Sequence, residues 1–416
     1  MKFTTTTRLA LLATVASAVL IQPAMALDAQ KFVDRLVAAY GAVGYDIKPG
    51  AVSADGENVI VKGVKIGLKA DAAAEPLSLD QDITFTNVAE GTDGSYTAES
   101  VTMPDVEYDI VDAKTPGHLS LKNIELDSLY VPGGDKPSFV NSLQMIGSLG
   151  AGPLVVTRAG AEVLSIDTIS ASNAFDPAQG SPDLASVAST FDLNGFKADL
   201  STVGEEDPSA GAIITELGLT KVSGDIDESM TWDMADGHVV IDNFTISLNE
   251  KGAVSFLADL TGFTPAVMDK LSAASADTAA KTPEQVQQAN GMLAMEVMSA
   301  VSITSASLRY DDASLANSLI DFFAKQQGTD HAGFVTGLKA MVPAMLAGVG
   351  IPALDALVVP AVNTFLDDPQ SLEVAVAPAS PTNLMVLMGA AANPAALIQT
   401  LGLTVTANVA APEGDE

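Results

Sequence analysis

The side chains able to bind metals or do acid–base chemistry are few and scattered. The 416-residue chain contains three histidines and no cysteine. His118 and His238 each follow a glycine at the start of an expected strand, and His331 lies in a turn before an expected helix. A structural zinc site needs four closely spaced Cys or His ligands. We therefore predict no catalytic histidine, no metal site and no cofactor site, and interpret the histidines as exposed turn residues.

Carboxylates are abundant, with 52 Asp and Glu against 20 Lys and Arg, and several occur in groups. Paired carboxylates can hydrolyse glycosides or bind calcium. Here the groups lie at expected turns, no EF-hand pattern surrounds them, and a single Trp is a poor platform for sugar rings. We therefore expect that the protein is not an enzyme. The groups are Glu205-Glu206-Asp207, Asp225-Ile226-Asp227-Glu228, Asp311-Asp312 and Asp367-Asp368.

The motifs of several enzyme classes are missing from the sequence. It contains neither the Gly-x-Ser-x-Gly elbow of α/β-hydrolases nor the phosphate-binding loop of P-loop NTPases. Trp232 and Tyr310 are expected to pack in the core from strands. Met292, Met295 and Met298 recur at three-residue spacing on an expected helix, which favours core packing over an adaptable apolar binding site.

The first 26 residues have the features of a cleavable export signal. Lys2 and Arg8 bracket the polar start, an apolar stretch follows over residues 9–21, and Ala24-Met25-Ala26 matches a small-x-small cleavage pattern. The apolar stretch is shorter than the roughly 20 residues of a spanning helix. We expect the mature chain to begin at Leu27. An export signal on a chain without cysteine favours a bacterial periplasm over a eukaryotic secretory pathway.

Charge and hydropathy narrow the choice of partners. The formal net charge of −32 argues against nucleic acid as a partner, because its binding needs clustered Lys and Arg. The mean hydropathy is nevertheless high, at +0.29, with no second uninterrupted apolar run long enough to span a bilayer. Such a chain has either a large ordinary core or an apolar groove.

Between residue 52 and about residue 263, apolar and polar residues alternate, and the phase of the alternation changes repeatedly at Asn or Gly. A one-residue slip moves the apolar set to the other face of a strand. A residue that tolerates unusual backbone angles at the slip indicates a bulge or bend, which returns the apolar side chains to the same interior. The slips lie at Gly63, Asn87, Asn123, Gly195 and Asn243, with a weaker copy at Ser305.

These patterns predict an α+β protein that is mostly antiparallel β, with an elongated curled sheet and a helix-rich C-terminal third; a compact sandwich is the alternative. Turns are expected at Asp55-Gly56, Asp93-Gly94 and Asp236-Gly237. We divide the chain into the signal peptide, residues 1–26, a mainly β region with a short N-terminal helix, residues 27–264, and a helix-rich region, residues 265–416, which is either separate or continuous with the β region. A helix over residues 313–327 is expected to bury Leu315, Leu319, Ile320 and Phe323.

The export segment, the short leading helix, the strand-bend unit LSLKNIEL at residues 119–126 and the block at residues 232–262 together resemble bacterial periplasmic proteins of the AsmA-like group. The resemblance implies a long curled β-sheet with an apolar inner groove and a role in lipid movement or homeostasis between two membranes. We do not expect this chain to retain the N-terminal membrane helix of that group, and its C-terminal third is expected to be unusually helical.

We expect a soluble, non-enzymatic periplasmic protein that shelters an apolar ligand such as a lipid or assists envelope maintenance, with peripheral contact with the envelope. The alternative is an envelope scaffold or protein-interaction module without a ligand.

Overall fold

The computed structural model describes most of the chain after the expected signal peptide, which lies outside the described residues. None of the helices in the described ranges is both long and apolar enough to cross a bilayer. The described residues are 27–68, 76–111, 115–134, 138–177, 184–203, 207–276, 283–349, 351–390 and 393–410.

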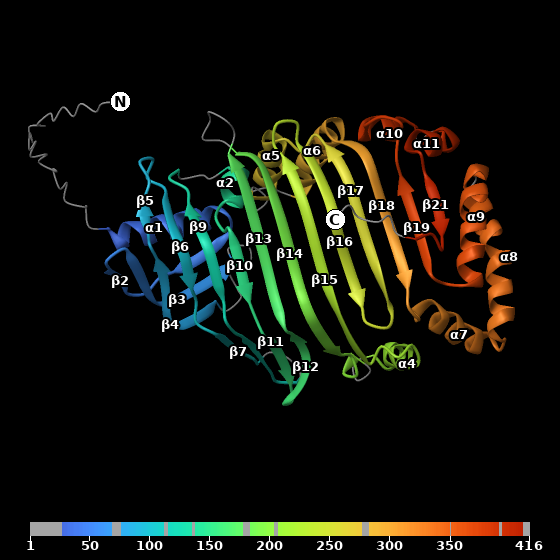
Figure 1. Cartoon of the computed structure of the whole chain (residues 1–416), viewed down its shortest axis with the longest axis horizontal. Helices are drawn as coiled ribbons and strands as arrows, with labels where there is room; N and C mark the ends of the chain where they lie inside the picture. Colours follow the sequence, from blue (N-terminus) through green and yellow to red (C-terminus); the bar gives the residue numbers. More distant parts are fainter. Residues whose placement is uncertain are drawn as a thin grey trace, which may run out of the picture.

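The dominant feature is one large antiparallel sheet that joins 21 strands of the described residues. Figure 1 shows it as an open, curled layer that runs from the N-terminal strands to the C-terminal helices, so the prediction of an elongated curled sheet is confirmed. The main path of pairing is β3–β4–β6–β9–β10–β13–β14–β15–β16–β17–β18–β19–β21. A branch, β7–β8–β11–β12, joins the C-terminal part of β14 at Lys197 and Ala198.

The N-terminal end of the sheet packs against helix α1, Ala29–Ala42, and forms the main core. Asp28 caps the helix by accepting a hydrogen bond from the Lys31 N–H at 3.1 Å. Phe32 is fully buried, and its ring meets the rings of Phe85 and Tyr96 edge-on at 5.1 and 5.5 Å. The strands of this end are β1 Tyr45–Lys48, β2 Val52–Asp55, β3 Asn58–Leu68, β4 Leu77–Thr86, β5 Ala89–Glu90, β6 Tyr96–Thr102, β7 Val106–Ile110, β8 Gly117–Leu121 and β9 Glu125–Val131.

The predicted phase changes occur where the sequence places them. Gly63 has a φ of +61°, and the register between β3 and β4 shifts between Lys62 and Val64. Val61 and Val64 are both buried in the core although they lie three positions apart, a spacing that would place them on opposite faces of a regular strand. The slip therefore keeps both halves of β3 facing the same interior. Asn87, Asn123 and Gly195 also have positive φ, at 49°, 51° and 68°.

The central part of the sheet consists of long strands joined by tight turns. Asp236-Gly237 turns β15 into β16 as predicted, with Asp233 opposite His238. The elements are helix α2 Phe139–Leu143, strands β10 Ser148–Ala151, β11 Leu154–Arg158, β12 Ala161–Ile166, β13 Thr168–Pro177 and β14 Leu184–Asp199, helix α4 Pro208–Glu216, and strands β15 Lys221–Asp233, β16 His238–Leu248 and β17 Gly252–Thr261.

Beyond residue 265 the chain is rich in helices but also supplies strands to the same sheet. β17 pairs with β18, and β18 pairs with β19, so residues 27–264 and 265–416 share one sheet. The elements are α5 Pro265–Ala276, α6 Pro283–Ala300, β18 Ser302–Asp312, α7 Leu315–Gln327, α8 His331–Val349, α9 Pro352–Asp367, β19 Ser371–Val376, β20 Thr382–Asn383, α10 Leu384–Ala390, α11 Pro394–Leu401 and β21 Thr404–Ala407.

The predicted inner face of α7 is only partly correct. Ile320 is buried, but Phe323 is 43 % exposed, and Phe322 is buried in its place. The Phe323 ring instead lies 6.3 Å from the ring of Phe334 in α8. The helix is rotated from its expected orientation because α8 supplies a second packing partner.

Candidate apolar binding surface

An apolar cavity of about 230 Å³ lies between α1 and the N-terminal strands. Its lining comes from α1 and from β1, β3, β4, β6 and β9, and includes Leu36, Tyr40, Tyr45 and Leu126. The rings of Tyr40 and Tyr45 meet edge-on at 6.0 Å, and Tyr45 is 40 % exposed. Burial raises the pKa of the Tyr40 hydroxyl to about 12. Tyr45 is therefore the more solvent-exposed of these two lining residues, and Tyr40 the more buried.

From this cavity, an apolar face continues across the central sheet. Directly paired residues of antiparallel strands lie on the same face. One row of such residues starts at Leu126, which lines the cavity. It continues on the next three strands through Leu149, Ala171 and Phe191, each of which pairs with the residue before it. The row continues through Glu228 and Phe244. Beyond β16 the same face carries Phe256, Leu308, Val374 and Val405.

A second row on the same face is apolar along its whole length. It begins at Ala151 and follows the pairing from strand to strand to the last strand, β21. Its members are Ala151, Ile169, Leu193, Ile226, Ile246, Val254, Tyr310, Leu372 and Ala407. Nine strand spacings of about 4.8 Å separate β9 from β21 on this path, so the apolar face is roughly 40 Å long.

Much of this apolar face is open to solvent. Leu308 is 53 % exposed, and Val254 and Val374 are each 42 % exposed. Phe244 and Ile246 on β16 are exposed as well. Large exposed apolar patches on soluble proteins mark interaction sites or ligand-binding grooves. We define the apolar face as the side of β9 to β21 that carries these two rows.

Helices bound the apolar face along one side and at its far end. Near α2 and α5, Trp232 and Val187 of the face pack against Phe139 and Met268. The Trp232 indole N–H donates to the Phe263 carbonyl at 2.8 Å, so the expected core position of this residue is confirmed. At the far end, the half-buried Tyr310 ring lies 6.2 Å from the ring of Phe365 in α9. Figure 1 shows α5, α6 and α10 along the upper edge, α8 and α9 beyond β21, and α7 at the lower edge.

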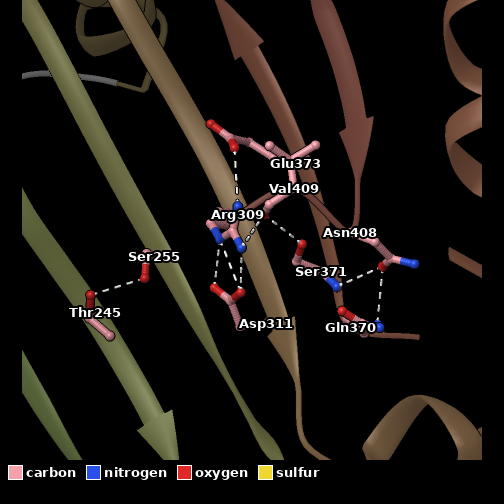
Figure 2. Close-up of polar contacts among 9 residues, drawn as sticks. All are labelled: Thr245, Ser255, Arg309, Asp311, Gln370, Ser371, Glu373, Asn408 and Val409. Atoms are coloured by element: carbon pink, nitrogen blue, oxygen red, sulfur yellow. Dashed lines mark hydrogen bonds and ion pairs between the residues drawn. The ribbon is translucent and has the colours of Figure 1, made fainter. Parts of the chain in front are cut away.

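The opposite face of the same strands is polar. Figure 2 shows Thr245 and Ser255 sharing a hydrogen bond of 3.0 Å, and Arg309 bound to Asp311 and Glu373 at 2.7 and 3.4 Å. The Arg309 guanidinium also donates to the Val409 carbonyl at 2.9 Å. Asp311 is the main cause of a raised pKa at Arg309. Antiparallel sheets commonly pack one face on a core and expose the other, polar face to solvent, so an exposed apolar face is the unusual feature of this sheet.

Glu228 is the one charged side chain on the apolar face within the paired residues of β13 to β17. It was expected in a turn with Asp225 and Asp227; that prediction is wrong, because all three lie inside β15. The alternation of the strand places Asp225 and Asp227 on the polar face and Glu228 on the apolar one. Burial raises the pKa of the half-buried Glu228 carboxyl.

The other acidic groups have structural partners. Asp207 caps α4 through the N–H groups of Ser209 and Ala210, whereas Glu205 and Glu206 lie outside the described residues. Asp312 accepts hydrogen bonds from the Tyr310 hydroxyl at 2.5 Å and the Ala316 N–H at 2.8 Å.

At the end of α9, Asp367 pairs with Lys339, and Asp368 accepts a hydrogen bond from the Gln370 side chain at 2.7 Å. Across the described ranges, no group of three or more His, Asp or Glu side chains is arranged to hold a metal ion.

Each histidine pairs with a carboxylate rather than with a second catalytic group. His118 lies between Asp109 and Glu107 at 2.8 and 2.7 Å, and these two carboxylates raise its pKa. His238 contacts Asp259 at 2.9 Å, and His331 contacts Asp321 at 2.7 Å. The three histidines lie on different elements, and the structure does not bring them together.

The expectation that the methionines of α6 pack in the core is wrong for two of them. Met292 and Met295 are 68 % and 59 % exposed, whereas Met298 is half-buried. Met385 and Met388 of α10, a helix that contacts α6, are also exposed. Three-residue spacing alone does not reveal which face of a helix meets the sheet.

Comparison with protein families gives a match to the C-terminal part of the chain. A family model described as "Uncharacterized protein" matches residues 245–408, which is 164 of the 416 residues. The matched range begins inside β16 and ends just after β21, so it contains the C-terminal half of the apolar face. None of the curated proteins matches the chain.

Proposed function

We propose that this protein is exported to the periplasm, is not an enzyme, and shelters an apolar or amphiphilic ligand such as a lipid on the apolar face of its sheet. The observation that carries the proposal is the open apolar row across the central strands. Leu308, Val254 and Val374 together expose apolar side chains on neighbouring strands of one face.

The apolar face leaves apolar side chains that a ligand can still bury, among them Leu308, Val254 and Val374. Removing apolar surface from water contributes about 25 cal/mol per Å², and an uncovered apolar face forgoes that contribution. On the polar face of the same strands, side chains form hydrogen bonds with one another, as the hydroxyls of Thr245 and Ser255 do. An alkyl chain laid along the apolar face supplies the missing burial without requiring any hydrogen bond.

The cavity under α1 extends the same surface. Leu126 belongs both to the cavity lining and to the first row of the apolar face. An alkyl chain on the central sheet can therefore end in the cavity near Tyr40 and Tyr45. This arrangement favours a long ligand over a compact one.

The experiment is extraction and mass spectrometry of lipids from the full chain, expressed in bacteria and purified from the periplasmic fraction without detergent. We expect a stoichiometric amphiphile. A folded protein without any bound apolar molecule, which also fails to bind a neutral pyrene-labelled long-chain alcohol, would refute the proposal and favour an envelope scaffold without a ligand.

A further inference from the structure

The position of Glu228 on the apolar face suggests what kind of ligand the face accepts. Its cross-strand partners on that face are Phe191 in β14 and Phe244 in β16. Its neighbours two residues away along β15 are Ile226 and Met230. A carboxylate is thus placed among four large apolar side chains, near the middle of the apolar face.

No group of the described chain compensates this carboxylate. Neither a side chain nor an N–H group in the described ranges donates a hydrogen bond to Glu228, and none of the residues paired on this face from β13 to β19 is Lys or Arg. The other carboxylate on this side, Asp312, has two donors. An alkyl chain that covered Glu228 would remove water from its carboxylate without supplying a positive partner. Removing an unpaired charge from water costs free energy.

We infer that the ligand of the apolar face carries an ammonium group, which binds between the Glu228 carboxylate and the rings of Phe191 and Phe244. This inference rests on the proposed function and names its ligand class. Side chains directly opposite each other in an antiparallel sheet have Cβ atoms about 4.5–5.5 Å apart. Ammonium groups bind aromatic faces at up to about 6 Å from the ring centre, so one cation reaches the carboxylate and a ring together.

The surroundings argue against other ligands for Glu228. A metal ion needs several oxygen ligands, and within the paired residues of β13 to β17 this face supplies no second carboxylate beside Glu228. An anionic headgroup would be repelled by the Glu228 carboxylate and by a chain of formal net charge −32. The residues paired on this face from β13 to β19 include no Lys or Arg to bind it. A ligand with an ammonium head complements both the local and the overall charge.

The apolar rows extend far enough on both sides of Glu228 to hold alkyl chains. Four strand spacings lie between β15 and β9, and five lie between β15 and β21, which at about 4.8 Å each gives roughly 20 Å in either direction. The head of the ligand therefore sits in the middle of the apolar face, and its tail or tails run toward the cavity under α1 or toward α9.

The test compares binding of dodecylammonium, dodecanol and dihexanoyl phosphatidylethanolamine to the full-length protein by isothermal titration calorimetry, with dodecanol below its solubility limit and the other two below their micellar concentrations. The variants are Glu228→Gln and a matched control, Asp227→Asn. The control removes the same charge from the adjacent position, which faces the opposite side of the sheet. Circular dichroism checks that both variants fold.

We expect the wild type to bind dodecylammonium at least about tenfold more tightly than dodecanol, as a charge-assisted contact implies. Glu228→Gln should lose that preference and keep dodecanol affinity within about twofold, whereas Asp227→Asn should change neither. Loss of phosphatidylethanolamine binding in Glu228→Gln identifies a zwitterionic lipid as a ligand; loss for dodecylammonium alone identifies simple long-chain amines.

An unchanged ammonium preference in Glu228→Gln would overturn the inference while leaving the proposed function intact. A wild type that binds dodecanol but shows no preference for dodecylammonium would overturn it as well. Failure of the wild type to bind any of the three probes would instead refute the proposed function.

Discussion

Replacement of Leu308 by aspartate should separate ligand binding from folding. Leu308 is 53 % exposed on the apolar face of β18, between Phe256 and Val374. Full burial of a leucine side chain contributes about 1.5–3 kcal/mol, so the buried half contributes roughly 1 kcal/mol to folding. We therefore expect Leu308→Asp to lower the free energy of unfolding by about 1 kcal/mol.

The loss of affinity for an alkyl ligand should be larger. The exposed half of Leu308 contributes roughly another 1 kcal/mol when a ligand covers it. A carboxylate under an alkyl chain adds a desolvation cost of about 1–3 kcal/mol. Together these give about 2 kcal/mol or more, which is roughly a thirtyfold loss of affinity.

The matched control is Leu257→Asp. Leu257 lies on the neighbouring strand β17 and is 38 % exposed, but it pairs with Ser307 and so faces the polar side of the sheet. The control should lower stability by a similar amount and leave affinity within about twofold. Urea denaturation measures stability, and fluorescence titration with a neutral pyrene-labelled long-chain alcohol measures affinity. Equal affinity losses in the two variants would show that the ligand does not lie on the apolar face.

Three further predictions test the packing of the N-terminal core, the close approach of two central strands and the charge on the apolar face. Phe32→Ala should lower the free energy of unfolding by about 3–5 kcal/mol in urea, because the fully buried ring packs against Phe85; a loss below about 1 kcal/mol would contradict the description of the core. Gly224→Ala should cost about 1–3 kcal/mol, because its Cβ would lie 1.8 Å from a main-chain oxygen of β16, whereas Gly150→Ala, with nothing within 4 Å, should cost less than about 1 kcal/mol. Glu228→Gln should raise the melting temperature at pH 7, since burial raises the Glu228 pKa in the folded state and wild-type stability falls as the pH rises through that pKa. The gain should vanish below the ordinary Glu pKa, where both states are protonated, and a gain that persists there would point to a cause other than charge.

The bends of the sheet could be predicted from local sequence because they depend on single residues. Gly63, Asn123 and Gly195 adopt positive φ at the predicted phase changes, and only Gly and Asn do so at low cost. At Asn243 the register shifts without a positive φ, between Ile241 and Thr245. The pairing of β16 with β15 shifts at the same place, between Ser229 and Met230, so this bulge involves both neighbouring strands.

The position of Glu228 could not be predicted from local sequence. Four residues that include three acids are typical of a turn, yet they lie in the middle of β15 because β14 and β16 pair with both of its edges. Pairing with partners far along the chain outweighs local propensity in a sheet. The exposure of Met292 and Met295 could not be predicted from local sequence either, because the packing of the helices decides which face of α6 is covered.

By itself, the sequence determined the antiparallel strands, the tight turns and the points at which the apolar side of a strand changes, because period-two alternation and left-handed residues act over a few positions. The tertiary structure alone decided that the strands of both halves join one sheet, that its apolar rows line up from Leu126 to Val405, and that members of these rows on β16 to β19 remain exposed. Which strands become neighbours depends on long-range pairing, and whether a face stays open depends on where the helices pack.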